Sequence, residues 1–304
     1  MRRQVIVGLM IGVAVMLGAG FVVWASTQGL LGPSAQARRF LSLADQAVKR
    51  GQPAEAEVKL QSLITNAPDG PWTDQALLKL GEVYEQQRQL SQARSAYTNL
   101  LEHFPNSTLI NDAQARLGRV NVSLLFSSVL TDQDTAYEVK PGDSLGKISE
   151  AYHTTVDLLR KANRLDGDII RPKQKLKIPT GHFHILVDKS QNTLLLTKEN
   201  QFFKCYTVST GSNNSTPVGT FKIVNKVPNP VWYHDGLAVP PDDPKNILGT
   251  RWMGFDKPAY GIHGTTDPGV LGQQVTAGCV RMKNEGVEEL FALIPIGTEV
   301  TIVD

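Results

Sequence analysis

Hydrophobic and polar positions divide the chain into four stretches with different periodicities. Residues 5–25 are apolar and uncharged throughout, and residues 35–130 repeat small and apolar positions at helical spacing. In residues 136–180, turn signals separate brief strands and helices, and from residue 181 onward apolar and polar positions alternate over short segments. Because helices and strands bury their faces with periods of 3.6 and 2.0, we predict a multidomain chain that passes from all-α to mainly β.

The first apolar run predicts a single transmembrane helix over residues 5–25. At about 1.5 Å per residue, such a run is long enough to cross about 30 Å of hydrocarbon. Arg2 and Arg3 precede it, so residues 1–4 are expected as a cytoplasmic tail and the rest of the chain on the outer face of a plasma membrane. The alternative is a cleaved signal peptide, because Ala35-Gln36-Ala37 has the small-x-small form of a cleavage site.

Residues 35–130 contain an internal repeat. Residues 43–68 align without a gap on residues 80–105, and both units end in a proline. Each unit predicts a helix pair, and an apolar helix near residues 107–126 can cap the stack. The pattern resembles the tetratricopeptide repeat, whose L-G-x-x-Y signature stands here at residues 80–84. Such a stack serves either as a docking surface for a protein partner or as a spacer.

Residues 136–180 predict a small βααβ module. The turn at residues 141–144 can cap a helix over 145–152, and Thr155 starts a second helix that ends near Asn163. The order Y-x-V-x-P-G-D-S-L to I-x-P-x-Q-K-L-x-I-P resembles a LysM domain. The resemblance implies binding of N-acetylglucosamine glycans, including peptidoglycan, by two loops with the candidate contacts Gly142, Asp143, Asp166 and Ile169. The alternative is a LysM fold kept as a structural linker.

Composition narrows the functional classes. The 304 residues carry 31 Lys+Arg against 29 Asp+Glu, a net charge of +2, which is too small for a nucleic-acid binder that neutralises many phosphates. Two cysteines, Cys205 and Cys279, are too few for a disulfide framework or a cysteine-based zinc site, and we expect neither metal nor cofactor. Cys205 falls in a predicted strand and is expected as a core or half-buried thiol.

Residues 181–304 predict a mainly β domain. Asn, Gly and Ser turns separate short alternating strands at 183–187, 193–197, 203–208 and 220–224. Residues 225–260 then combine several prolines with aromatic residues. Ordered loops of this length are uncommon and are often lids or substrate-binding arms. We therefore expect Trp232 and Trp252 to contact an extended substrate.

His263 and Cys279 form the candidate reactive pair. A thiol becomes a useful nucleophile near neutral pH when an imidazole and a cation favour its ionised form, and Arg281 is the available cation. Gly278 lets the backbone turn tightly, so that the amides beside Cys279 can face a developing oxyanion. By themselves, a His and a Cys sixteen residues apart are explained equally well by a buried free thiol and an unrelated histidine.

From about residue 182 to the end, the chain resembles the catalytic domain of YkuD-type L,D-transpeptidases. The resemblance rests on the segments at 208–211, 216–221, 248–252, 260–265, 278–282 and 296–300. It implies Cys279 as the acyl-forming nucleophile and His263 as general base and later acid. It also implies further roles, namely imidazole orientation by the Gly264 carbonyl, oxyanion binding by the Gly278 and Cys279 amides, thiolate or carboxylate binding by Arg281, and substrate contact by Tyr260.

The implied reaction acts on a peptidoglycan stem. Cys279 attacks the L,D bond between a diamino acid at position three and D-Ala at position four, D-Ala leaves, and a thioester forms. An amine of a neighbouring stem gives a 3→3 cross-link, a free D-amino acid gives exchange, and water gives trimming, as in an L,D-carboxypeptidase. The family also implies reaction with carbapenems and a role in wall organisation and cell shape. With the predicted membrane helix, we expect a single-pass protein of the bacterial plasma (inner) membrane, with its catalytic part in the periplasm or cell wall.

Two other enzyme classes and a non-enzymatic function are the alternatives. NlpC/P60-type enzymes place Cys before His in the chain, whereas here His263 comes first, and sortases space these residues much more widely. A membrane-tethered wall scaffold with a degenerate tail would not need to retain both Cys279 and His263. The chain departs from many family members at Ala277, where those members carry a second histidine.

Overall fold

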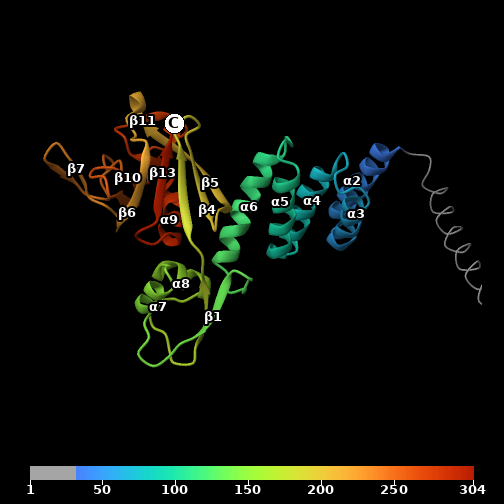
Figure 1. Ribbon diagram of the computed structural model, residues 1–304, viewed down its shortest axis with the longest axis horizontal. Helices are drawn as coiled ribbons and strands as arrows, with labels where there is room; N and C mark the ends of the chain where they lie inside the picture. Colours follow the sequence, from blue (N-terminus) through green and yellow to red (C-terminus); the bar gives the residue numbers. More distant parts are fainter. Residues whose placement is uncertain (1–31) are drawn as a thin grey trace, which may run out of the picture.

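The computed structural model describes residues 32–304 and consists of three modules. Figure 1 shows a row of helices on the right (residues 33–125, the helical arm), a strand-rich unit on the left (residues 183–303, the β domain) and a small α/β unit below the strand-rich unit (residues 134–179, the small module). The predicted membrane helix at residues 5–25 lies outside the described residues. Within residues 32–304, no helix combines the length and hydropathy that crossing a membrane requires.

Five antiparallel-packed helices build the helical arm, two for each predicted repeat and one as the expected cap. They are α2 (Pro33–Lys49), α3 (Pro53–Asn66), α4 (Thr73–Gln86), α5 (Leu90–His103) and α6 (Ile110–Leu125). Small residues permit the close packing: Ala47 and Ala56 are fully buried, and a methyl group on Gly81 would stand 2.2 Å from the ring of Tyr97. The aligned repeat positions therefore mark helix–helix contacts.

The small module has the predicted βααβ order. Strands β1 (Asp134–Glu138) and β2 (Lys175–Pro179) pair antiparallel, and α7 (Leu145–Ala151) and α8 (Val156–Asn163) lie between them in the chain. Ser144 Oγ accepts the amide hydrogen of Lys147, and Thr155 Oγ1 accepts that of Leu158. Both helices thus begin at the predicted caps, because a hydroxyl there satisfies an amide that has no helical partner.

The β domain is built on a nine-stranded sheet in the order β11-β5-β12-β10-β9-β6-β13-β3-β4. Because β4 also pairs with β5, the sheet closes on itself. Helix α9 (Asn284–Leu293) packs against β9 and β10 with side chains that are fully buried. The strands are β3 (Phe183–Asp188), β4 (Thr193–Lys198), β5 (Gln201–Gly211), β6 (Gly219–Pro228), β9 (Arg251–Phe255), β10 (Gly261–His263), β11 (Gln274–Thr276), β12 (Val280–Met282) and β13 (Glu299–Val303).

The four strands predicted from alternation correspond to β3, β4, β5 and β6. The expected loop over residues 225–260 is wrong in part, because β6 continues to Pro228 and a hairpin follows. This hairpin, β7 (Trp232–His234) with β8 (Leu237–Val239), pairs only with itself and projects from the domain as an arm. Its strands are three residues long, too short for alternation to distinguish them from a loop.

Candidate active site

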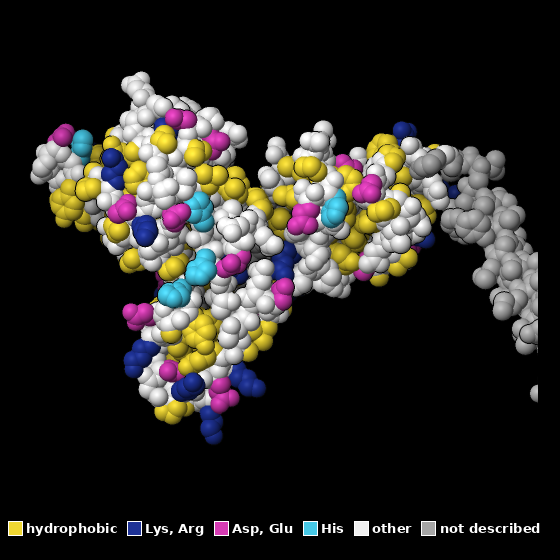
Figure 2. Space-filling view, in the orientation of Figure 1, with side chains coloured by type: hydrophobic (Ala, Val, Ile, Leu, Met, Phe, Trp, Pro, Cys, Tyr) yellow, Lys and Arg dark blue, Asp and Glu magenta, His cyan; other side chains and the backbone are white. Residues whose placement is uncertain are grey.

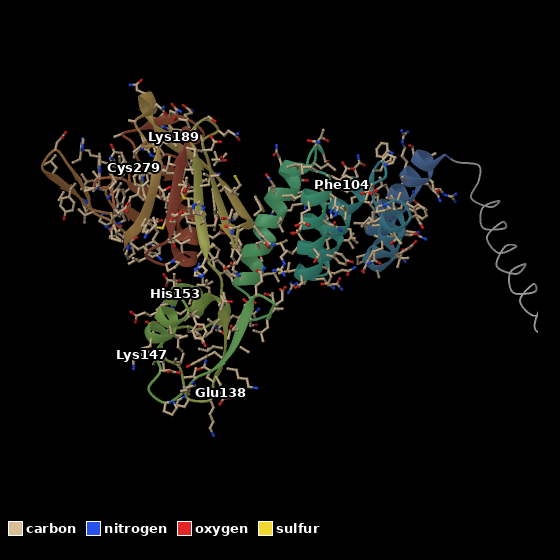
Figure 3. All side chains as sticks on the ribbon, viewed as in Figure 1. Phe104, Glu138, Lys147, His153, Lys189 and Cys279 are labelled. Carbon is tan, nitrogen blue, oxygen red and sulfur yellow. The ribbon has the colours of Figure 1, made fainter. Side chains whose placement is uncertain are left out.

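Two adjacent parallel strands bring the candidate nucleophile and base together. Strand β10 ends at His263 and pairs in parallel with β12, in the register Ile262↔Val280 and His263↔Arg281. Cys279 immediately precedes β12. The sheet therefore places residues that are sixteen apart in sequence on neighbouring strands, and both side chains line one cavity. Figure 3 shows Cys279 in the β domain, away from the small module.

His263 is held as a neutral imidazole in a defined orientation. Its ring is 2 % exposed, and its Nδ1 lies 2.7 Å from the Gly264 carbonyl oxygen. Because a carbonyl only accepts, Nδ1 carries the hydrogen and Nε2 is left as the basic nitrogen. Burial lowers the pKa of His263 to about 4, and the Arg281 charge acts in the same direction. Trp252 stacks on the ring with centroids 6.0 Å apart.

The surroundings of Cys279 favour its protonated thiol. Its Sγ lies 3.5 Å from the Ala259 carbonyl oxygen, which can only accept. Burial raises the pKa of Cys279, although a main-chain hydrogen bond from Gly261 and the charge of Arg281 act against the shift. Burial thus favours the neutral forms of both groups in the resting site.

Gly278 shapes the turn before the nucleophile. Its φ is +129°, and a methyl group there would stand 2.7 Å from the ring of Tyr260. The Gly278 amide donates to Thr276 Oγ1 at 3.1 Å, and this hydroxyl donates to the Cys279 carbonyl at 2.7 Å. The amide predicted for the oxyanion hole is thus engaged in the resting site. Sequence reasoning gave Thr276 no role, since a threonine in a turn carries no specific signal.

A cavity of about 880 Å³ opens over the reactive pair, between the sheet and the β7–β8 arm. Trp232 and Trp252 line it as predicted, whereas Tyr260 packs against Gly278 and is not among the lining residues. Arg281 also lines it, and its buried Nε has no hydrogen-bond partner in the part of the chain that the structure describes. Figure 2 shows hydrophobic side chains along the lower side of the arm, with acidic and histidine side chains near its tip. The cavity therefore offers apolar walls and one cation.

Asn284, at the start of α9, is a site residue that sequence reasoning missed. Its Oδ1 accepts the amide hydrogens of Thr250 and Thr265 at 3.2 and 3.0 Å, and its Nδ2 donates to the Thr265 carbonyl at 2.8 Å. A methyl group on Gly264 would stand 2.2 Å from Oδ1. Asn284 thus fastens the loop whose Gly264 carbonyl orients His263. Its only sequence signal is an asparagine at a helix start, which usually indicates a cap.

The predicted glycan contacts in the small module differ in availability. Asp143 Oδ2 accepts from the Tyr137 hydroxyl and from the Lys140 amide, both at 2.7 Å, so this carboxylate closes its own turn. Gly142 adopts a φ of +87° in that turn. Asp166 is exposed, and Ile169 is 84 % exposed. Of the four residues, Ile169 presents the largest free apolar surface, which suits the face of a sugar ring.

Comparison with known proteins assigns all three modules. Residues 182–302 match the L,D-transpeptidase catalytic domain, residues 137–179 the LysM domain, and residues 75–107 the tetratricopeptide repeat. The last match covers the second of the two predicted repeats. The chain is 35% identical over 174 residues to the putative L,D-transpeptidase YkuD of Bacillus licheniformis, covering 55% of this chain and 97% of the relative.

Other similarities concern the same part of the chain. The putative L,D-transpeptidase YqjB of Bacillus subtilis is 38% identical over 130 residues, 41% of this chain and 73% of the relative. A crystal structure of an L,D-transpeptidase from Mycobacterium tuberculosis is 16% identical and covers 44% of this chain and 63% of its own, with a TM-score of 0.35. With almost the full length of the Bacillus licheniformis protein matched, the chain belongs to the YkuD family of L,D-transpeptidases.

Proposed function

We propose that this chain remodels peptidoglycan by attacking the L,D bond of a tetrapeptide stem with Cys279 and transferring the acyl group to an amine. The observation that carries the proposal is the pairing of β10 with β12, which puts the thiol and an oriented, neutral imidazole in one cavity. A neutral pair suits this chemistry, because the base must be free to take a proton at the moment of attack.

The first half-reaction forms a thioester. Nε2 of His263 takes the thiol proton as Sγ attacks the carbonyl carbon of the third stem residue. The negative oxygen is bound by the Cys279 amide, and the Gly278 amide can join once it exchanges Thr276 Oγ1 for the oxyanion. Collapse of the intermediate breaks the C–N bond, and the imidazolium gives its proton to the departing amine of D-Ala. A pKa of about 4 for His263 makes the imidazolium a strong acid for this step.

The second half-reaction returns the thiol. An acceptor amine enters the cavity, loses a proton to Nε2 of His263 and attacks the thioester carbonyl. The new amide forms, the C–S bond breaks, and the proton passes back to Sγ. Arg281 is suited to a substrate carboxylate, because its buried Nε has no partner within residues 32–304. The apolar walls of the cavity favour a stem over water as the acceptor, and hence a 3→3 cross-link.

The test uses the full chain in detergent with disaccharide-tetrapeptide muropeptides. We expect mass spectrometry to detect release of D-Ala and formation of dimers, and a carbapenem to add covalently to Cys279. Cys279→Ala should abolish both, while Cys205→Ala is the matched control, because Cys205 is an exposed free thiol on β5. Cys205 was expected as a core or half-buried thiol, and the structure shows it exposed.

Each failure of the test identifies a different function. Stem trimming without dimers would assign an L,D-carboxypeptidase. Wall binding without turnover or adduct, in wild type and Cys279→Ala alike, would assign a non-catalytic scaffold and refute the proposal.

The proposed substrate also determines where the chain must act. We propose a bacterial inner-membrane location, with residues 5–25 as the anchor and the three modules outside, since the wall lies there. The small module then binds glycan strands, and the helical arm is available to a protein partner. Alkaline extraction of membranes tests the anchor, and N-terminal sequencing that begins at Arg38 would indicate a cleaved signal peptide instead.

A further inference from the structure

The last helix of the helical arm is packed into the β domain. Val122 and Leu125 of α6 belong to the same buried cluster as the core strands of that domain. Asn121 Nδ2 donates to the Phe203 carbonyl of β5 at 2.9 Å in a buried position. Helix α6 therefore serves two modules at once, as the cap of the helical repeat and as part of the β-domain core.

The small module is attached to the β domain by α8. Leu158, which is 1 % exposed, is a member of the same β-domain cluster. Thr155 Oγ1, besides capping α8, lies 2.5 Å from the Ala292 carbonyl of α9. The short connection between the two modules is itself bonded, because Thr180 donates to the Gln133 carbonyl through both its amide and its hydroxyl. Swinging this module away would expose apolar surface and unpair polar groups.

A buried lysine joins the small module to the helical arm. The Lys177 side chain, on β2, is 2 % exposed and forms an ion pair with Asp134 at 3.2 Å. Its Nζ donates to three main-chain carbonyls, that of Leu124 in the last turn of α6 and those of Ser127 and Val129 in the segment that follows, at 2.8, 3.0 and 2.7 Å. All three hydrogens of the ammonium thus bind main chain at the end of the helical arm.

These contacts give the small module a fixed position relative to Cys279. A flexibly tethered binder raises the local concentration of substrate over every direction that its linker allows, whereas a fixed binder helps only where the geometry permits both contacts. Figure 3 shows Lys147 in the small module and Cys279 within the β domain, well separated in this view. Lys147 Nζ donates to the Gly142 carbonyl and so marks the predicted glycan loop. One ligand can reach both the glycan loop and Cys279 only if it is extended.

We infer that the small module is held at a fixed distance from Cys279. The preferred substrate is then a glycan strand long enough to contact this module while one of its own stems reaches Cys279. The inference rests on the proposed function and adds the substrate class, a polymer in place of a free muropeptide. This distance is set by three attachments, those of α8 to α9, of Asn121 to β5 and of Lys177 to α6.

The first experiment uses wild-type full chain and glycan strands of graded length that carry tetrapeptide stems. If the small module is fixed, turnover per stem should depend on strand length with a single threshold. It should rise about tenfold or more once a strand reaches that length and remain constant beyond it. A smooth rise with length would instead indicate a flexible tether and would overturn the inference.

The second experiment loosens the attachment. Leu158→Ser with Lys177→Met and Asp134→Asn removes the core contact and the ion pair without leaving an unpaired buried charge. The matched control is Lys175→Met with Glu138→Gln, a neutralised cross-strand pair on the same two strands. We expect the loosened variant to lose the threshold, to keep its turnover of soluble muropeptides, and to show a wider distribution of sizes in solution scattering.

The outcomes separate this inference from the proposed function. An unchanged threshold in a variant that scattering shows to be loosened would refute the fixed distance between the small module and Cys279. The proposed transpeptidase function would still stand. Absence of turnover by wild type on either substrate would overturn the proposed function itself. If the loosened variant does not fold, the strand-length series on wild type decides alone.

Discussion

Replacing Asn284 with alanine tests whether the loop that it fastens controls catalysis. The change removes three hydrogen bonds, two from the amides of Thr250 and Thr265 and one to the Thr265 carbonyl. At about 1 kcal/mol each, the loss of folding free energy is about 3 kcal/mol. The Gly264 carbonyl, which sets the orientation of His263 at 2.7 Å, then loses the support of Asn284, and the hydrogen bond from the Gly264 amide to the Arg251 carbonyl remains.

The expected effect on catalysis is larger than the effect on stability. A displacement of about 1 Å in a catalytic group costs about a hundredfold in rate. We therefore expect the rate of carbapenem acylation at Cys279 to fall about a hundredfold, while the thermal unfolding midpoint falls by about 10 °C or less. Stopped-flow fluorescence under saturating carbapenem measures the first quantity and calorimetry the second.

Two further variants separate positioning from general destabilisation. Asn284→Asp keeps both accepted hydrogen bonds but loses the donated one, so its acylation rate should lie between those of wild type and Asn284→Ala. Glu285→Ala, at the next and exposed position of α9, should leave the rate unchanged. An Asn284→Ala enzyme that is less stable but acylates at the wild-type rate would refute the positioning role.

Three further outcomes follow from the site and the small module. Since burial lowers the pKa of His263 to about 4, the acylation rate should persist at pH 5 and fall only near pH 4, and a midpoint at pH 6.5 in the rate profile would contradict this. The folded state should also lose stability as the pH falls from about 6.5 to 4, because in this range only the unfolded chain binds a proton at this histidine. Gly278→Ala should abolish the carbapenem adduct seen by mass spectrometry, while Gly269→Ala should keep it, because Gly269 does not have a positive φ. A full adduct in both variants would show that the turn at residue 278 tolerates a side chain. Ile169→Ser should weaken retention on purified sacculi severalfold, with Val58→Ser, exposed on the helical arm, as control; equal retention would remove Ile169 from the glycan contact.

Local sequence determined the elements and the identity of the reactive pair. Ser144 and Thr155 cap the two helices of the small module, and the alternating segments became strands β3 to β6. These features follow from side-chain periodicity and from hydrogen bonds over three or four residues, which depend on neighbours in the chain. The resemblance to the YkuD family likewise rested on short contiguous motifs around His263 and Cys279.

Only the tertiary structure decided the state and the setting of that pair. The pKa shifts of His263 and Cys279 toward their neutral forms result from burial, which depends on strands that arrive from elsewhere in the chain. Three other contacts also need groups that packing brings together. They are the hydrogen bonds of Asn284 to the Thr265 loop, of the Gly278 amide to Thr276, and of Lys177 to the end of α6. Such contacts have no period along the sequence, because each depends on where the fold places two distant segments.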